Sequence, residues 1–197
     1  MLYEEPEYAR SIQIRFLNDG LKNGECCVYS ASDQDSVNLT KIDMVQSGID
    51  IDKYMNSGLL QFHVRNASIY DPESYYRART AFQKEIENTF VSAPQRTTAM
   101  PSKIRGVGSI FPFVFTSVEN ANSKRSEATS QLLVENLFQS ESSSYNSSFK
   151  GAWMCTYQVN NILENMTEDW MKQVLGSHDA VMFLPKLSNG IALNTRK

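Results

Sequence analysis

Few side chains in this sequence could carry out nucleophilic or metal chemistry. The chain has two histidines, His63 and His178, and three cysteines, Cys26, Cys27 and Cys155. The histidines, cysteines and aspartates do not cluster with the spacing of metal ligands. Neighbouring Cys26 and Cys27 would point to opposite faces of a strand, and a cysteine in a strand like that of Cys155 is more often buried than catalytic. We therefore expect no catalytic residue, metal or cofactor, and predict that the chain is not an enzyme.

The sequence also lacks a phosphate-binding loop. The motif G-x-x-x-x-G-K-[ST] is absent, and Glu4, Glu5 and Glu7 stand where such a loop would follow the first expected strand. Carboxylates at a helix N-terminus occupy the positive end of the helix dipole and repel phosphate. Gly106-Val107-Gly108 lacks the third glycine of a dinucleotide turn, so we interpret these as strand glycines beside a closely packed element. We expect neither tight nucleotide binding nor ATP hydrolysis.

Composition is that of an ordinary globular protein. The 197 residues are 41% hydrophobic and 21% charged, which fits one domain over residues 1–197. The net charge of −3 argues against direct binding of nucleic acid. No apolar run approaches the roughly 20 residues of a membrane helix, and the acidic start lacks the apolar region of a signal peptide. Three unpatterned cysteines favour a reducing cytoplasm.

Short apolar runs alternate with helical patterns, which predicts an α/β fold with a mainly parallel central sheet flanked by helices. The expected strands are Met1–Tyr3, Glu25–Ser30, Leu59–Val64, Lys103–Ile110, Gly151–Tyr157, Ala180–Leu184 and an edge strand Gly190–Leu193. The expected helices are Glu5–Leu21, Ser36–Ser47, Ile51–Asn56, one that begins at Asp71-Pro72, Lys124–Gln139 and one from Thr167 to Leu175.

Apolar spacing predicts which helix faces are buried. In the first helix the expected core residues are Ala9, Ile12 and Phe16, and in the second they are Val37, Ile42 and Val45.

Six strings, taken in order, resemble the methanogen/methylotroph sensory domain (MEDS) family, named with the dichloromethane-responsive repressor. They are LYEEPEYA, FLNDGLKNGECCVY, SGIDIDKYMNSGLLQF, LLVENLFQS, MCTYQV and WMKQVLGSHDAVMFLPK, and they cover nearly the whole chain. The resemblance implies a three-layer α/β/α fold of the RecA/KaiC type without the phosphate loop. It also implies a non-enzymatic sensory domain that binds a small organic ligand and acts through a signalling partner protein.

The chain departs from that family in two places. Relatives carry apolar residues before the LYE string, so the first strand is expected to be shortened or to begin upstream of Met1. Relatives commonly have Tyr-Asp where this chain has Tyr157-Gln158, so a role that needs that carboxylate is not transferred.

In open α/β sheets, ligands bind beyond the carboxyl ends of the strands. Tyr29 and Tyr157 stand at two such ends and could form an aromatic wall with hydroxyls, or pack in the core. Glu135 could be a carboxylate in an apolar neighbourhood, or the solvated edge of its helix. His178 would cap a helix C-terminus more readily than it would bind ligand, and Arg105 would pair with an acid more readily than it would reach a ligand.

Two other functions are kept beside the sensory one. One is a degenerate nucleotide-binding relative of RecA-like ATPases, and the other is an assembly scaffold that uses apolar residues in Phe111–Phe115 to form a homo-oligomer. The expected partners are thus a small organic ligand, a signalling protein and a second copy of the chain, with neither nucleic acid nor a membrane.

Overall fold

The computed structural model describes residues 1–31, 33–64, 103–109, 151–159, 180–184 and 191–194, together with positions 81, 84, 85, 88 and 172. The helices expected from Asp71 and from Thr167 are described only at such single positions, which are helical. The expected helix Lys124–Gln139 and the segment Phe111–Phe115 lie outside the described residues.

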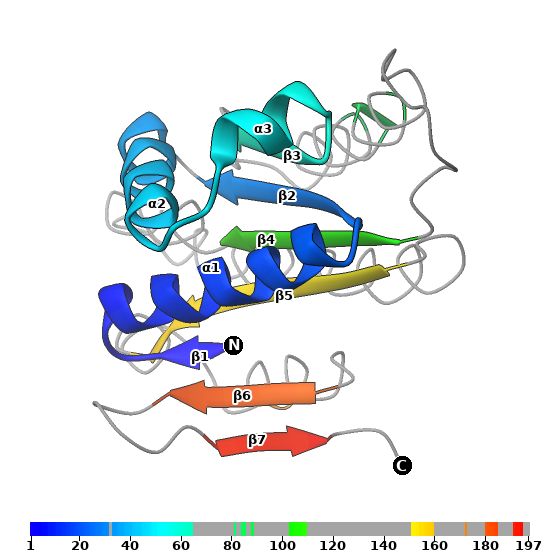
Figure 1. Ribbon diagram of the computed structural model, residues 1–197. Coiled ribbons are helices and arrows are strands. Elements are labelled where there is room, and N and C mark those ends of the chain that lie inside the picture. The colour runs from blue at the N-terminus through cyan, green and yellow to red at the C-terminus, as the bar shows by residue number, and fades with distance from the viewer. Residues whose placement is uncertain are drawn as a thin grey trace, which may run out of the picture.

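The described strands form one seven-stranded sheet in the order β3-β2-β4-β5-β1-β6-β7 (Figure 1). Strands β1 to β6 are parallel, and β7 is the antiparallel edge. This confirms the α/β class with a mainly parallel sheet, and each expected strand is found within one residue at either end. Their bounds are β1 Leu2–Tyr3, β2 Cys26–Ala31, β3 Leu60–Val64, β4 Ile104–Ser109, β5 Gly151–Gln158, β6 Ala180–Leu184 and β7 Ile191–Asn194.

Three described helices follow the first strands of the chain: α1 (Pro6–Lys22), α2 (Gln34–Gln46) and α3 (Ile51–Asn56). Helix α2 begins where the Asp33 carboxylate accepts a hydrogen bond of 2.7 Å from the Ser36 amide. Helices α1 and α2 end just before glycines with positive φ, 70° at Gly24 and 77° at Gly48. Helix α1 runs across β4 and β5 on its way from β1 to β2 (Figure 1).

Helices α1 and α2 cover the same face of the sheet, because their apolar residues share one core cluster with those of β2 and β4. On α1 the buried stripe is centred differently from the prediction, since Ala9 is buried but Ile12 and Phe16 lie half-buried at its flanks. The buried residues of α1 are Ala9, Gln13, Ile14, Leu17, Gly20 and Leu21.

On α2 the predicted core face is wrong for two residues. Val37 is buried, but Ile42 and Val45 are 53% and 55% exposed. The helix packs on β2 and β3 with a narrow stripe, and that stripe is made by Val37, Thr40 and Met44 at spacings of three and four. Ile42 and Val45 therefore point to solvent.

Close packing explains the glycine and cysteine patterns of the central strands. Gly106 on β4 faces Trp153 on β5, and a Cβ at Gly106 would lie 1.9 Å from the indole ring. The interpretation of Gly106 as a strand glycine is thus confirmed. Cys27 packs in the cluster beneath α1, whereas Cys26 packs with Trp153 on the other face of the sheet, as strand alternation predicts.

Candidate functional site

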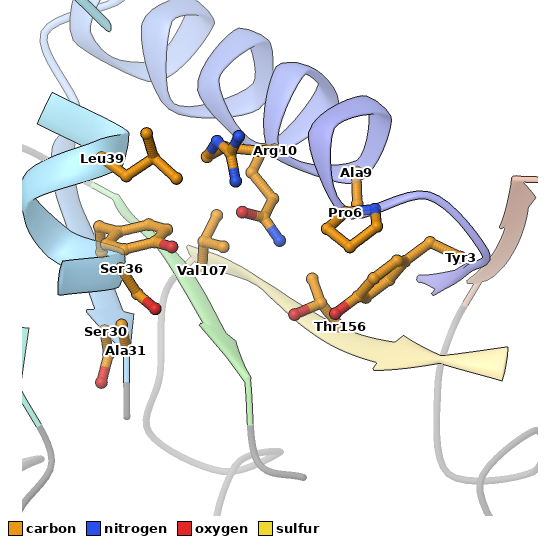
Figure 2. A pocket seen from close by; sticks show the side chains of 12 residues that line it. Tyr3, Pro6, Ala9, Arg10, Ser30, Ala31, Ser36, Leu39, Val107 and Thr156 are labelled. Atoms are coloured by element: carbon orange, nitrogen blue, oxygen red, sulfur yellow. The ribbon is translucent and has the colours of Figure 1, made fainter. Parts of the chain in front are cut away.

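A cavity of about 170 Å³ lies where four parallel strands end, between the sheet and the first two helices (Figure 2). Its wall comes from the carboxyl ends of β1, β2, β4 and β5 and from the first halves of α1 and α2. This is the edge of the sheet at which the sequence predicted a ligand. The lining residues are Tyr3, Pro6, Ala9, Arg10, Gln13, Tyr29, Ser30, Ala31, Ser36, Leu39, Val107 and Thr156.

The turn that leads into this cavity is very short. Only Glu4 and Glu5 separate the end of β1 from the start of α1. Pro6 occupies the first turn of α1 and has no N–H, and Glu5 forms no side-chain cap. A phosphate loop needs a run of backbone amides between strand and helix. The described turn instead offers two carboxylates and a pyrrolidine ring.

The interior of the cavity is polar but uncharged overall. The Arg10 guanidinium is held by the Asp43 carboxylate, with Nε and Oδ2 2.5 Å apart. No carboxylate is among the described lining residues. Ser36 donates its hydroxyl hydrogen to Asp33 at 2.8 Å, so this hydroxyl is already engaged.

Two tyrosine phenols face the cavity from adjacent parts of the wall. Burial raises the pKa of both Tyr3 and Tyr29, and the nearness of Tyr29 adds to the rise at Tyr3. The Thr40 hydroxyl lies close enough to oppose the rise at Tyr29, although its geometry falls short of a hydrogen bond. Both phenols are therefore neutral at physiological pH. In Figure 2 the Tyr3 hydroxyl points toward Thr156.

Gln13 is the most unusual of the lining residues. It belongs to the buried face of α1, is only 8% exposed, and lines the cavity. Across the described part of the chain, its side-chain amide has no hydrogen-bond partner. The fully buried polar side-chain atoms without a partner in the described part of the chain are Thr40 Oγ1 and Gln61 Nε2, so the Gln13 amide atoms are instead open to the cavity.

The structure brings one of the predicted site residues into this cavity and places two elsewhere. Tyr29 lines it. Tyr157 is only 2% exposed and does not line it, because side chains alternate along β5 and Thr156 is the residue that faces α1. Glu135 and His178 lie outside the described residues.

Arg105 lies near the amino end of β4, at the edge of the sheet away from the cavity. It forms an ion pair with Glu25, donates to the Phe16 carbonyl at 3.2 Å, and stacks 5.0 Å from the Phe16 ring. The pairing with an acid that the sequence favoured is thus what the structure shows.

Gln13 and Thr156 are among the lining residues that the sequence did not single out. A signal for Gln13 was available, because it stands between Ala9 and Leu17 at spacings of four and so shares their buried face. Thr156 carries no such signal, since its place depends on which strands become neighbours, whereas Tyr3 stands at the end of an expected strand.

The mainly parallel sheet with α1 and α2 packed on one face has an α/β fold of the KaiC-like type, as the following similarity shows. The chain is similar to the solved structure of a KaiC-like protein from the hyperthermophilic archaeon Pyrococcus horikoshii OT3, at 13% identity and a TM-score of 0.56. The similarity covers 98% of this chain and 76% of that one, and it confirms the fold class expected from the sequence. No family model matches the chain, and no curated protein matches it.

Two features bear on other classes of site. Among the described residues, no helix is long and apolar enough to cross a membrane. The same part of the chain contains no group of three or more histidine, cysteine, aspartate or glutamate side chains that could hold a metal ion.

Proposed function

We propose that the chain is a non-enzymatic sensory domain that binds a small organic ligand in the cavity at the carboxyl edge of its sheet. The observation that carries the proposal is the two-residue turn between β1 and α1, which opens onto this cavity without a phosphate loop. The resemblance to the MEDS sensory family, which implies the same function, supports it.

The size of the cavity favours a small ligand over a nucleotide. Pockets for drug-sized ligands and cofactors enclose roughly 300–1,000 Å³. The cavity here measures about 170 Å³, close to the roughly 150 Å³ that holds a benzene molecule. Glu4, Glu5 and Glu7 at the start of α1 would also repel a phosphate. These features count against the degenerate ATPase.

The described cysteines are poorly suited to catalysis. All three are free thiols and buried. Burial raises the pKa of Cys27 to about 12, and its thiol donates to the Leu17 carbonyl at 3.3 Å. A thiolate is the form that reacts, so this thiol is inert near neutral pH. Free thiols also agree with the proposed location in the cytoplasm.

Action through a partner protein is the second part of the proposal. Helix α2 exposes Leu39, Ile42 and Val45 on its outer side. Adjacent exposed apolar residues are typical of surfaces that contact other proteins. Leu39 also lines the cavity, so the helix that would touch the ligand is the one that would touch a partner. The same apolar side supports the assembly scaffold as a second candidate.

A thermal-shift panel tests the ligand proposal. Uncharged organic molecules of about six non-hydrogen atoms are compared with ATP and ADP, since a ligand at free concentration L that binds only the folded state stabilises it by RT ln(1 + L/Kd) and so raises the melting temperature. At least one organic compound should stabilise the wild type and the control Tyr54→Phe, and stabilise Tyr29→Phe less. Stabilisation by ATP with none by any organic compound, or no stabilisation by either, would overturn the proposal.

A further inference from the structure

The buried amide of Gln13 sets the hydrogen-bonding requirement of the cavity. Its Nε2 group donates and its Oε1 atom accepts, and neither has a partner among the described residues. Gln13 is only 8% exposed, and its side chain lines the cavity. Its amide atoms are open to the cavity, so water can hydrogen-bond to them when no ligand is bound. An occupant of the cavity could satisfy both atoms.

The remaining polar wall excludes a charged occupant. The Arg10 guanidinium is already neutralised by Asp43, and no carboxylate lines the cavity in the described part of the chain. The phenols of Tyr3 and Tyr29 are neutral hydrogen-bonding groups. An anion or cation placed here would lose its hydration without meeting a free counter-charge, which is costly in a buried site. The occupant is therefore uncharged.

We propose that the ligand is a small carboxamide whose C=O accepts from Gln13 Nε2 and whose N–H donates to Gln13 Oε1. A side-chain amide and a ligand amide offer one donor and one acceptor each in matching positions. Ala9, Leu39 and Val107 line the same cavity and would contact the hydrocarbon part of the ligand. About six non-hydrogen atoms fill the available volume. This inference rests on the proposed function and specifies the ligand class.

A series of probes with one carbon skeleton tests the ligand class. Isobutyramide, isobutyrate, isobutylammonium and 3-methyl-2-butanone are nearly equal in size, and the ketone keeps the C=O but lacks the N–H. Dissociation constants are measured by ligand-detected NMR titration at pH 7 and fixed salt. We expect isobutyramide to bind in the range of about 1 mM, at least tenfold more tightly than either ion and more tightly than the ketone.

Two substitutions connect this preference to Gln13. Gln13→Met keeps the length of the side chain and removes its amide, and should weaken isobutyramide at least fivefold while leaving the ketone within twofold. Gln13→Glu replaces the donor by a second acceptor and should shift the preference from isobutyramide to isobutyramidinium. The control is Gln46→Met, at an exposed position on α2. It should change neither the affinity for isobutyramide nor that for the ketone.

The outcomes separate this inference from the proposed function. If an ion binds best, or Gln13→Met leaves isobutyramide binding unchanged, the carboxamide assignment is wrong, while Tyr29-dependent binding of any organic compound keeps the proposed function. If neither this series nor the wider panel binds, both are wrong.

Discussion

The substitution Gln13→Met should stabilise the unliganded protein. An amide that only cavity water can hydrogen-bond costs part of the about 1–3 kcal/mol of a fully unpartnered buried amide, and Met removes the polar group at similar volume. Water in the cavity can satisfy part of the amide, so we expect the low end of that range, about 1 kcal/mol. Helix propensities of Gln and Met are nearly equal, so α1 itself contributes little to the difference. For a chain of 197 residues this corresponds to a rise in melting temperature of about 2–4 °C.

Urea unfolding followed by circular dichroism measures this change, with Gln46→Met as the exposed control that should stay within about 0.5 kcal/mol of wild type. The slope of the unfolding free energy against urea should be unchanged, because the folded surface is the same. A loss of more than about 1 kcal/mol in Gln13→Met would show that the amide is satisfied in the folded protein. The hydrogen-bonding requirement assigned to the cavity would then be unfounded.

Three further predictions concern the surrounding fold. Gly106→Ala should destabilise the protein by about 2–3 kcal/mol, because its Cβ would overlap the Trp153 ring, and Trp153→Val should recover much of that loss in the double variant, as measured by urea unfolding. Cys27, with a pKa of about 12, should resist Ellman's reagent at pH 8, where only about one thiol in ten thousand is ionised, and should react once the protein is unfolded; rapid labelling of the native protein at that residue would contradict its assigned pKa. Arg105→Met should lower stability by about 1–2 kcal/mol through loss of its partners on Glu25 and Phe16, yet leave ligand binding unchanged; a change in affinity would return Arg105 to the list of site residues.

The strands could be predicted from the sequence because parallel strands buried on both faces form continuous apolar runs. CCVYSA in β2 and AVMFL in β6 are such runs, and both strands lie within one residue of their expected bounds. Pairing partners could not be predicted in the same way. Leu2 lies between Tyr157 and Phe183, and no local pattern connects these three residues.

The candidate site was predictable in place but not in detail. The carboxyl edge follows from parallel topology, and Tyr29 follows from its position at the end of β2. Tyr157 does not line the cavity, because the register of β5 turns the neighbouring Thr156 toward α1. On α2, Ile42 and Val45 were expected in the core because they are apolar and stand at helical spacing. That spacing does not indicate which side of the helix packs against the sheet, and these two residues are exposed.

The position of β1 within the sheet imposes an order on folding during synthesis. The amine of Met1, directly before β1, donates to the Cys155 carbonyl, a partner 154 positions later in the chain. At roughly 5–20 residues per second, a ribosome needs about 8–30 s to make that intervening stretch. Strands β2 and β3 can pair early, whereas β1 waits without neighbours until β5 and β6 emerge. Tyr3 is synthesised before this interval and Thr156 after it, so the two residues come together only when β5 is available. The ligand cavity therefore forms only after β5 has been synthesised, and a ligand can stabilise the chain only from that point on.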